Sequence, residues 1–479
     1  MGALLVLVPL LGVVLLNLPL GRLPDRIALP LSAVLCAAEG VAATVAPPTF
    51  WARAPVLPGL DLAELFQAKF PVDDLARVMF LSAALVGFSA VLVARYSLAG
   101  DEKRFRFANL LLLSLAGMNG IVLVRDLLGL YVFLEITAVA SFVLIALERG
   151  RAAFEGAFKY MVLSAVATAM IVAALALLFM VAGSTSFEVV AAALRGRTSS
   201  LLTVTAVALF VGGLAIKSGV VPFHGWLPDA YSAAPAAVSV LLAGVVTKTT
   251  GVYTLMRLVD AVFGYGAPVR NVLLLTGLVS IVVGALGALG QRDLKRMLAY
   301  SSISQVGYIV LGLGAGPGLG FAGALFHLFN HAVFKSLLFV NSAAVEQQAG
   351  TRDMDRLGGI ASRMPVTGTT SILAMLSTAG IPPLAGFWSK LLIIVAVWRA
   401  GHPALAAVAI LASVLTLAYF LSMQRRVFFG KLAEGCATLK EASAWALVPA
   451  LLLAVITVAL GLAAPWLFQT FLLRVESIL

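Results

Sequence analysis

Charged residues are scarce in this chain of 479 residues: Asp, Glu, Lys and Arg make up 11% of it, whereas 61% is hydrophobic. Apolar stretches of about 18 residues or more recur along the sequence, and each could cross a hydrocarbon core of about 30 Å as a helix. A soluble core could not hide that much apolar sequence. The composition therefore predicts an all-α polytopic membrane protein that lies in the lipid bilayer.

Cysteine and histidine are equally rare, with two cysteines and four histidines in the chain. Cys36 and Cys436 form no CxxC pair, so they cannot hold an iron–sulfur cluster. The glycine-rich stretch at 312–320 lacks GxGxxG spacing, and no GxSxG or Ser–His–Asp arrangement can be assembled outside the membrane. We therefore expect no cofactor, no bound metal and no catalysis by this chain alone. A nucleic-acid partner is excluded too, because no soluble basic face exists.

Hydrophobicity predicts about fourteen membrane spans along the chain. They lie near 2–20, 28–47, 75–97, 107–124, 127–147, 160–182, 201–221, 236–259, 271–289, 297–313, 318–343, 366–397 (interrupted), 403–423 and 446–470.

The net charge of +11 is mainly an orientation signal, because the loops on one side of the predicted spans carry most of the positive charge. That side holds Arg22, Arg26, Lys103, Arg104, Arg106, Arg149, Arg151, Arg292, Lys295, Arg296, Arg352, Arg356, Arg363, Arg425, Arg426, Lys431 and Lys440. The opposite loops hold Arg53, Lys69, Arg125, Arg195, Arg197, Arg270 and Arg399, beside an acidic loop at 48–74. An even number of spans then places both termini outside the cytoplasm. The expected location is the cell (inner) membrane of a prokaryote.

Two segments are interrupted by Gly and Pro next to a lysine: LAIKSGVVPFHGWLPDA at 214–230 and STAGIPPLAGFWSK at 377–390. Non-helical backbone at membrane depth is tolerated only where protein buries it or where it lines a water-filled cavity. Paired interruptions in two halves of a chain indicate an inverted-repeat transporter. We expect one repeat over 105–260 and another over 270–425, preceded by three helices in 1–104 and followed by one helix in 426–479.

Several ionisable residues fall inside these spans, where a charge costs about 2.5–3.5 kcal/mol even on a lenient insertion scale. They are Glu135, Lys217, Lys248, His327, His331, Lys335 and Lys390. The alternative is that the lysines extend to the membrane surface. That alternative suits Lys159, at a span end with Glu155 four residues earlier, and it stays open for Lys217 taken alone. Lys248, Lys335 and Glu135 lie several turns from a span end, which favours function.

Buried acid–base pairs suit proton transfer, because desolvation disfavours the charged form of a side chain and an opposite charge restores it. We expect Glu135 to pair with Lys217 on a neighbouring helix. Separating the pair would release the lysine's proton through water towards Lys248. The route would continue by way of His327, His331 and Lys335 to Lys390, since histidines titrate near neutral pH.

Other roles exist for the histidines. His327 and His331 are four residues apart on one helix face, as in some metal sites, but no HExxH glutamate or third ligand accompanies them. A plain hydrogen-bonded histidine is the further alternative. His224 and Asp229, beyond the first interruption, either line a cytoplasmic water access or only cap and turn the chain.

With these residues laid out, the chain resembles the antiporter-like subunit family of respiratory complex I, group 4 membrane-bound hydrogenases and Mrp cation/proton antiporters. The resemblance rests on LYVFLEIT (130–137), FKYMVLSA (158–165), KSGVVPFHGWLPDAYSAAPAAVSVLLAGVVTK (217–248), KRMLAYSSISQVGYI (295–309), FHLFNHAVFKSLLF (326–339) and GIPPLAGFWSK (380–390). It implies fourteen helices with two inverted five-helix repeats, and key residues at Glu135, Lys217, Lys248 and Lys390. WLPDAY and Gln305 look most like the D-type chain of Mrp antiporters.

The sequence thus predicts a subunit that moves protons, with Na⁺ as a candidate counter-ion, inside a larger membrane complex. That complex is either an Mrp-type antiporter or a redox-driven hydrogenase or NADH-quinone oxidoreductase, whose electron transfer would belong to other subunits. The alternatives are a self-sufficient solute transporter built on the same interrupted helices and a structural subunit that conducts nothing. Co-purification with other membrane subunits separates the first interpretation from a self-sufficient transporter.

Overall fold

The computed structural model describes residues 2–19, 23–46, 56–57, 60–61, 72–195 and 200–468, which are almost wholly helical. Within them, twelve helices are long and apolar enough to cross a membrane. The prediction of an all-α polytopic membrane protein is confirmed. Some of the residues used in the orientation argument lie outside the described part. They are Arg22, Arg53, Lys69 and Arg197, with most of the acidic loop at 48–74.

The remaining two predicted spans correspond to shorter helices. The first is α1 (Leu4–Leu16), an apolar helix of 13 residues. The other is the interrupted span predicted at 366–397, which consists of α17 (Pro365–Ala379) and α18 (Ala385–Arg399), each of 15 residues. Each predicted span therefore has a helical counterpart, although the outermost residues of several spans fall outside the described part.

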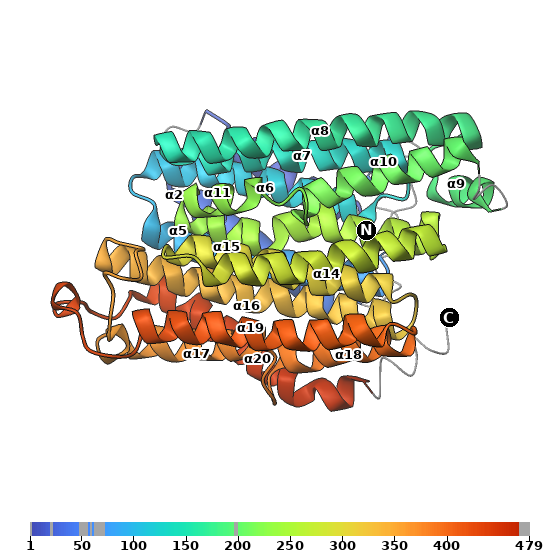
Figure 1. The fold of residues 1–479 in the computed structure, drawn as a ribbon. Helices are drawn as coiled ribbons and strands as arrows, with labels where there is room; N and C mark the ends of the chain where they lie inside the picture. The colour runs from blue at the N-terminus through green and yellow to red at the C-terminus, as the bar shows by residue number, and fades with distance from the viewer. Residues whose placement is uncertain are drawn as a thin grey trace. The chain divides into compact units, whose positions relative to one another are not determined.

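The chain divides into two compact units. The first comprises Met1–Val91, Leu98–Ser218 and Val245–Gly264, and the second comprises Leu92–Ser97, Gly219–Gly244 and Tyr265–Leu479. Figure 1 traces both units by residue number.

In the first unit, α7, α8 and α10 pack together, as Figure 1 shows for the three labelled helices. The helical elements of this unit are α1, α2 (Leu23–Val45), α5 (Asp74–Ser97, up to Val91), α6 (Asp101–Leu123), α7 (Leu127–Ile145), η1 (Ala146–Glu148), α8 (Arg151–Ala182), α9 (Phe187–Leu194), α10 (Leu201–Ser218), η3 (Lys248–Tyr253), α13 (Thr254–Leu258) and η4 (Val259–Phe263). A two-residue antiparallel pair, β1 (Val56–Leu57) and β2 (Leu60–Asp61), lies between α2 and α5 in the sequence.

In the second unit, α16 contacts α15, α17, α18 and α20 and is buried along most of its length. The elements of this unit are α11 (Trp226–Ala233), α12 (Ala236–Leu241), α14 (Ala267–Leu289), α15 (Leu294–Gly314), α16 (Leu319–Ala349), η5 (Ile360–Ser362), α17, α18, α19 (Pro403–Val427), η6 (Glu434–Cys436) and α20 (Ala444–Leu467). The short π-helix η2 (Leu242–Val246) continues α12 towards η3, which is also a π-helix.

Polar residues at the helix ends fix where these elements start and stop. Asp126 caps α7 by accepting a hydrogen bond from the Gly129 amide at 2.8 Å, which satisfies one of the free N–H groups of the first turn. Asp293 caps α15 in the same way through the amide of Arg296, also at 2.8 Å. Gly350, with φ of 65°, ends α16 in a left-handed conformation that favours glycine.

Both predicted interruptions are present in the backbone. Helix α10 ends at Ser218, and Gly219 follows with φ of 67°. Helix α17 ends at Ala379, and Gly380 follows with φ of 86°. In each case, a left-handed glycine turns the chain out of the helix, and prolines two or three residues later prevent the helix from resuming at once.

Small residues bring α14 and α15 into close contact. A Cβ atom at Gly277 would lie 2.6 Å from the Leu311 amide nitrogen, and one at Gly284 would lie 2.4 Å from that of Ser304. Only glycine permits this separation. Such packing is the usual way in which membrane helices associate, because lipid supplies no hydrophobic drive between them.

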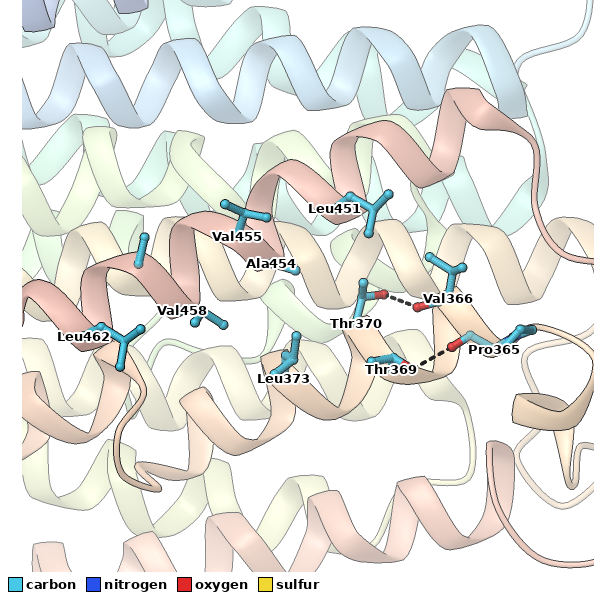
Figure 2. A pocket seen from close by; sticks show the side chains of 11 residues that line it. Pro365, Val366, Thr369, Thr370, Leu373, Leu451, Ala454, Val455, Val458 and Leu462 are labelled. Atoms are coloured by element: carbon cyan, nitrogen blue, oxygen red, sulfur yellow. Dashed lines mark hydrogen bonds between the residues drawn. The ribbon is translucent and has the colours of Figure 1, made fainter.

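A groove of about 630 Å³ lies between α17 and α20 of the second unit. Figure 2 shows its apolar lining and its two threonines. The Thr369 hydroxyl donates to the Pro365 carbonyl at 2.8 Å, and the Thr370 hydroxyl donates to the Val366 carbonyl at 3.0 Å. The Thr370 hydroxyl also lies 3.1 Å from Asn341 Oδ1 of α16, so both hydroxyls have partners within the protein. None of the ionisable residues singled out from the sequence lines the groove.

Candidate functional site

The predicted pair of Glu135 and Lys217 is present in the first unit. Lys217 Nζ lies 3.2 Å from Glu135 Oε1, and it joins α10 to α7. The Lys217 side chain is only 2% exposed, whereas that of Glu135 is 30% exposed. The lysine is therefore the buried member of the pair, and the glutamate is the member that surrounding molecules can reach.

Helix α8 supplies two hydroxyls that complete this pair. Thr168 donates a hydrogen bond to Glu135 Oε1 at 2.6 Å, and Ser164 lies 3.2 Å from Lys217 Nζ. The close approach of α10 to α8 depends on Gly213, where a Cβ atom would meet the Ala167 carbonyl at 2.9 Å. Because Thr168 and Ser164 are one helical turn apart, a single face of α8 holds both charged groups.

Lys248 is fully buried in the same unit, on the π-helix η3. Its Nζ donates to Thr247 Oγ1 at 3.1 Å. The helix carrying it packs directly on the end of α10, because a Cβ atom at Gly251 would lie 2.5 Å from both N and Cα of Ser218. The lysine of η3 thus belongs to a segment that touches the residue next to Lys217. π-helical turns are common at functional sites.

In the second unit, His327 and Lys390 share an aromatic neighbour. Lys390 Nζ lies 4.5 Å from the centre of the Tyr308 ring, and the ring centres of Tyr308 and His327 are 5.9 Å apart. His327 Nδ1 makes a 2.8 Å hydrogen bond with Ser389 Oγ, and Lys390 Nζ donates to the Ala379 carbonyl at 3.4 Å. Ser389, which bonds His327, and Lys390 are therefore consecutive residues of α18, just after the second interruption.

His331 and Lys335 continue the same face of α16, four and eight residues after His327, and both are fully buried. Lys335 Nζ donates to the Leu298 carbonyl at 3.3 Å and to the Ser301 hydroxyl, both on α15, and lies 5.6 Å from the Phe420 ring centre. The hydrogen bonds of Lys335 thus run to α15. Lys335 shares a face of α16 with His327 and His331 because the three residues are spaced four apart.

The two residues beyond the first interruption differ in their surroundings. Asp229, in the first turn of α11, forms an ion pair with Arg296 of α15. His224 lies in the turn before α11 and is partly exposed. Lys159, for which the membrane surface was the favoured explanation, pairs with Glu155 at 2.6 Å, and both side chains are exposed. That geometry fits the surface explanation.

Several buried charged groups were not recognised from the sequence, and Lys295 and Glu39 are two of them. Lys295 was counted as a loop charge, yet it is 2% exposed and its Nζ lies 3.0 Å from Glu346 Oε2. Glu39, 5% exposed on α2, accepts a hydrogen bond from Asn119 of α6 at 3.0 Å. The available signal for Glu39 was a carboxylate inside the predicted span at 28–47. For Lys295 the sequence offered none, because it stands beside Arg292 and Arg296.

Across the part of the chain that the structure describes, no three His, Cys, Asp or Glu side chains gather in a group that could hold a metal ion. The nitrogen of His327 that faces α18 is already bonded to Ser389. The chemistry offered by these residues is therefore that of buried lysines, a glutamate and histidines linked by hydroxyls, which can accept and release protons.

Helices interrupted beside buried lysines, with a glutamate–lysine pair inside the bundle, define an ion-handling class of polytopic membrane protein. The family comparison is more specific. Residues 124–416 match the model of the family described as "NADH:quinone oxidoreductase/Mrp antiporter, TM", and the chain belongs to that family. The matched range contains every residue of the expected proton route and confirms the resemblance seen in the sequence.

Individual relatives cover most of the chain. The N-type chain of the NADH-quinone oxidoreductase of Desulforudis audaxviator is 36% identical over 408 residues, which is 82% of this chain and 81% of the relative. The D-type chain of the Na⁺/H⁺ antiporter of Alkalihalophilus pseudofirmus is 33% identical over 432 residues, 88% and 87% of the two chains. A chain in the structure of the Mrp complex from Dietzia sp. has a TM-score of 0.87 and 26% identity, covering 98% and 95%.

Proposed function

We propose that this chain translocates protons as one membrane subunit of a multisubunit complex. The observation that carries the proposal is the buried ion pair of Lys217 and Glu135, with 3.2 Å between Nζ and Oε1, inside the segment that matches the family. Support also comes from relatives that are named as subunits of an NADH-quinone oxidoreductase and of an Na⁺/H⁺ antiporter.

The proposed switch is the opening and closing of this pair. When it is closed, Glu135 stabilises the charged form of Lys217, which would otherwise be costly in a buried site. When Glu135 moves away, the ammonium of Lys217 loses that compensation and gives up its proton. The exposure of Glu135, 30% against 2% for Lys217, makes the glutamate the member that a neighbouring subunit or water can draw away.

From Lys217 the proposed route continues to Lys248, whose helix touches the end of α10. In the second unit, it comprises His327, His331, Lys335 and finally Lys390. His224 and Asp229 are the proposed water access. Support for the second segment is the burial of these four residues, three of which share one face of α16, and the bond of His327 to Ser389, next to Lys390 just after the second interruption.

The proposed architecture behind the route is a pair of inverted five-helix repeats over 105–260 and 270–425. Its support is the similarity of the two interruptions, where α10 and α17 each end at a left-handed glycine and a lysine lies nearby. Lys217 precedes its glycine by two residues, and Lys390 follows Gly380 by ten.

The proposal is tested by proton transport into liposomes that contain the intact complex. Glu135→Gln and Lys217→Met keep approximate side-chain volume and remove the charges of the pair, so each should abolish transport. The matched control is the exposed pair Glu155 and Lys159 of α8, whose neutralisation should leave transport unchanged. Transport at the wild-type rate by either variant of the buried pair would reject the mechanism.

Purification tests the assembly. The proposal requires other membrane subunits to co-purify with this chain, whereas a self-sufficient solute transporter would be active alone. A pulse of Na⁺ or of an electron donor, applied to the same liposomes, identifies the driving reaction. The proposed location is the cell membrane of a prokaryote, and the loop charges suggest that both termini face away from the cytoplasm.

A further inference from the structure

Glu39 forms a buried polar contact that lies outside the proposed proton route. It is on α2, and the residue is 5% exposed. Its partner is Asn119 of α6, 1% exposed, which donates from Nδ2 to Glu39 Oε2 at 3.0 Å. The same amide group donates to the Leu5 carbonyl of α1 at 2.8 Å. Three helices of the first unit thus meet at one carboxylate and one amide.

Two oxygen atoms at this contact are left without a hydrogen bond. Both N–H donors of Asn119 are used, by Glu39 Oε2 and by Leu5. Glu39 Oε1 and Asn119 Oδ1 are buried, and neither has a hydrogen-bond donor within the described part of the chain. Buried acceptors without donors are unusual in native structures, so we expect each of these oxygens to have a hydrogen-bond partner in the native protein.

Arg77 of α5 reaches α2 one turn after Glu39, but its guanidinium donates to the backbone carbonyls of Ala43, Thr44 and Ala46. Cys36 lies one turn earlier on α2 and packs on Gly87 of α5, where a Cβ atom would come within 2.9 Å of its sulfur. Gly40 packs against Ala84 of α5 in the same way. Among the described residues, no lysine, arginine or histidine forms an ion pair with Glu39. An ionised carboxylate here would be buried with a single donor, which is strongly unfavourable.

A metal cation would not satisfy the site either. Hard cations such as Ca²⁺ take six to eight oxygen ligands, whereas only two unpaired oxygens are present here. One proton is sufficient. On Glu39 Oε1, it would turn that oxygen into a donor, with the unpaired Asn119 Oδ1 available as its acceptor, so that a single atom would satisfy both oxygens.

We infer that Glu39 is a second proton-binding carboxyl group of this protein, held neutral in a head-to-tail pair with Asn119. The pair has two parallel hydrogen bonds, Nδ2–H to Oε2 and Oε1–H to Oδ1. Binding forms one O–H bond and changes the charge of the side chain from −1 to 0; release returns the proton to water. This inference does not depend on the route through Glu135 and Lys217.

The position of the pair gives it access to one end of the first unit. Asn119 is six residues, or about 9 Å along a helix, from Arg125 just beyond the end of α6. The end of α2 is held four residues after Glu39, where Arg77 Nε donates to the Ala43 carbonyl at 3.0 Å. Glu39 therefore lies about one to two turns inside the helix ends, close enough for proton exchange with the aqueous phase.

Infrared spectroscopy of the full chain, in the complex with which it purifies, tests the inference without measuring transport. At neutral pH, the wild type should show the C=O band of a protonated carboxylic acid, which shifts in D₂O. Glu39→Gln should remove that band, and Asn119→Leu should change its frequency because the acceptor of the O–H is lost. Glu155→Gln, at an exposed ion pair, should leave it unchanged. A spectrum that Glu39→Gln does not alter would overturn the inference.

Thermal stability provides a second test. Glutamine carries an N–H donor where the neutral acid carries O–H, so Glu39→Gln should melt within about 2 °C of the wild type. Glu39→Leu removes both hydrogen bonds and should melt at a clearly lower temperature. If Glu39→Gln is as unstable as Glu39→Leu, the native side chain is ionised and the inference fails.

Discussion

Lys295 Nζ lies 3.0 Å from Glu346 Oε2 in the second unit, and this pair has the same division of exposure as the pair of Lys217 and Glu135 in the first. The lysine is 2% exposed in each pair, and the glutamates are 33% and 30% exposed. Lys295 also donates to the Ala234 carbonyl at 3.1 Å, so α15 is tied both to α16 and to the segment before α12. A buried lysine with a partly exposed glutamate is thus repeated within the chain.

Because Lys295 is buried and Glu346 is partly exposed, we expect unequal losses of stability when either charge is removed. Glu346→Gln removes the carboxylate that pairs with the buried ammonium of Lys295, which should destabilise the fold by about 3 kcal/mol. Lys295→Met leaves a glutamate that is one-third exposed and can be hydrated, so its cost should be smaller. Thermal unfolding of the purified complex measures both variants. A greater loss for Lys295→Met than for Glu346→Gln would contradict the prediction.

Close packing of η3 on α10 predicts that Gly251 tolerates no side chain. A Cβ atom there would lie 2.5 Å from the backbone N and Cα of Ser218, and neither can move without shifting Lys217. Gly251→Ala should therefore cost about 1–3 kcal/mol of stability and lower proton transport as well. The control is Gly150→Ala, where φ is −81° and no atom lies within 4 Å. Equal behaviour of the two variants would show that this contact does not position the lysine.

We expect the stability of the fold to depend on pH through the carboxylate of Asp73. Its oxygens accept two hydrogen bonds from Arg257, at 2.6 and 2.7 Å, just before α5 begins. Burial acts to raise the pKa of Asp73, but the hydrogen bonds and charge of Arg257, the Ala76 amide and the charge of Arg125 outweigh it, so the pKa is lowered. A lowered pKa contributes stability that is fully present above the unfolded value of about 3.9 and is lost as the pH falls through the folded value.

The measurement is the melting temperature between pH 5 and pH 3. Asp73→Asn should melt below the wild type at pH 5, where the carboxylate is charged. The difference should narrow towards pH 3, because the wild type then loses the same interaction by protonation. A constant difference across this range would mean that the ion pair with Arg257 does not stabilise the fold.

The ring of Tyr308 is predicted to matter for Lys390 through its π face, which lies 4.5 Å from Nζ. Tyr308→Phe keeps that face but removes the hydroxyl that donates to the Ala409 carbonyl at 2.7 Å. Tyr308→Leu removes both. A cation–π contact is worth about 1–2 kcal/mol when desolvated, so proton transport should fall about 5- to 30-fold more in the leucine variant than in the phenylalanine variant. Equal transport by the two variants would exclude the contact from function.

Much of the fold follows from local sequence. Apolar run lengths gave the spans, and the glycine–proline clusters after Lys217 and before Lys390 gave the two interruptions, because turn chemistry depends on neighbouring residues in the chain. The ion pair of Glu135 and Lys217 was also predictable, since two charges inside membrane helices need compensation. The contacts of Ser164 and Thr168 with this pair were not predictable, because in the sequence both are ordinary polar residues of a long helix.

Lys295 and Glu39 show where sequence reasoning ends. Lys295 stands among loop arginines, and only the packing of α15 against α16 places its ammonium beside Glu346, 51 positions later in the chain. Glu39 was visible as a carboxylate in a span, but its partner Asn119 is 80 positions away, on another helix. No local pattern specifies such a partner.

The sequence by itself determined that this protein lies in a membrane, where its helices break, and which charged side chains would be buried at those breaks, because the bilayer penalises each charge wherever it occurs. The tertiary structure decided which carboxylate meets which lysine and which amide meets Glu39. Those pairings depend on distances of about 3 Å between polar side-chain atoms of neighbouring helices. The glycines and hydroxyls at the helix contacts set these distances, and the composition of any one span does not.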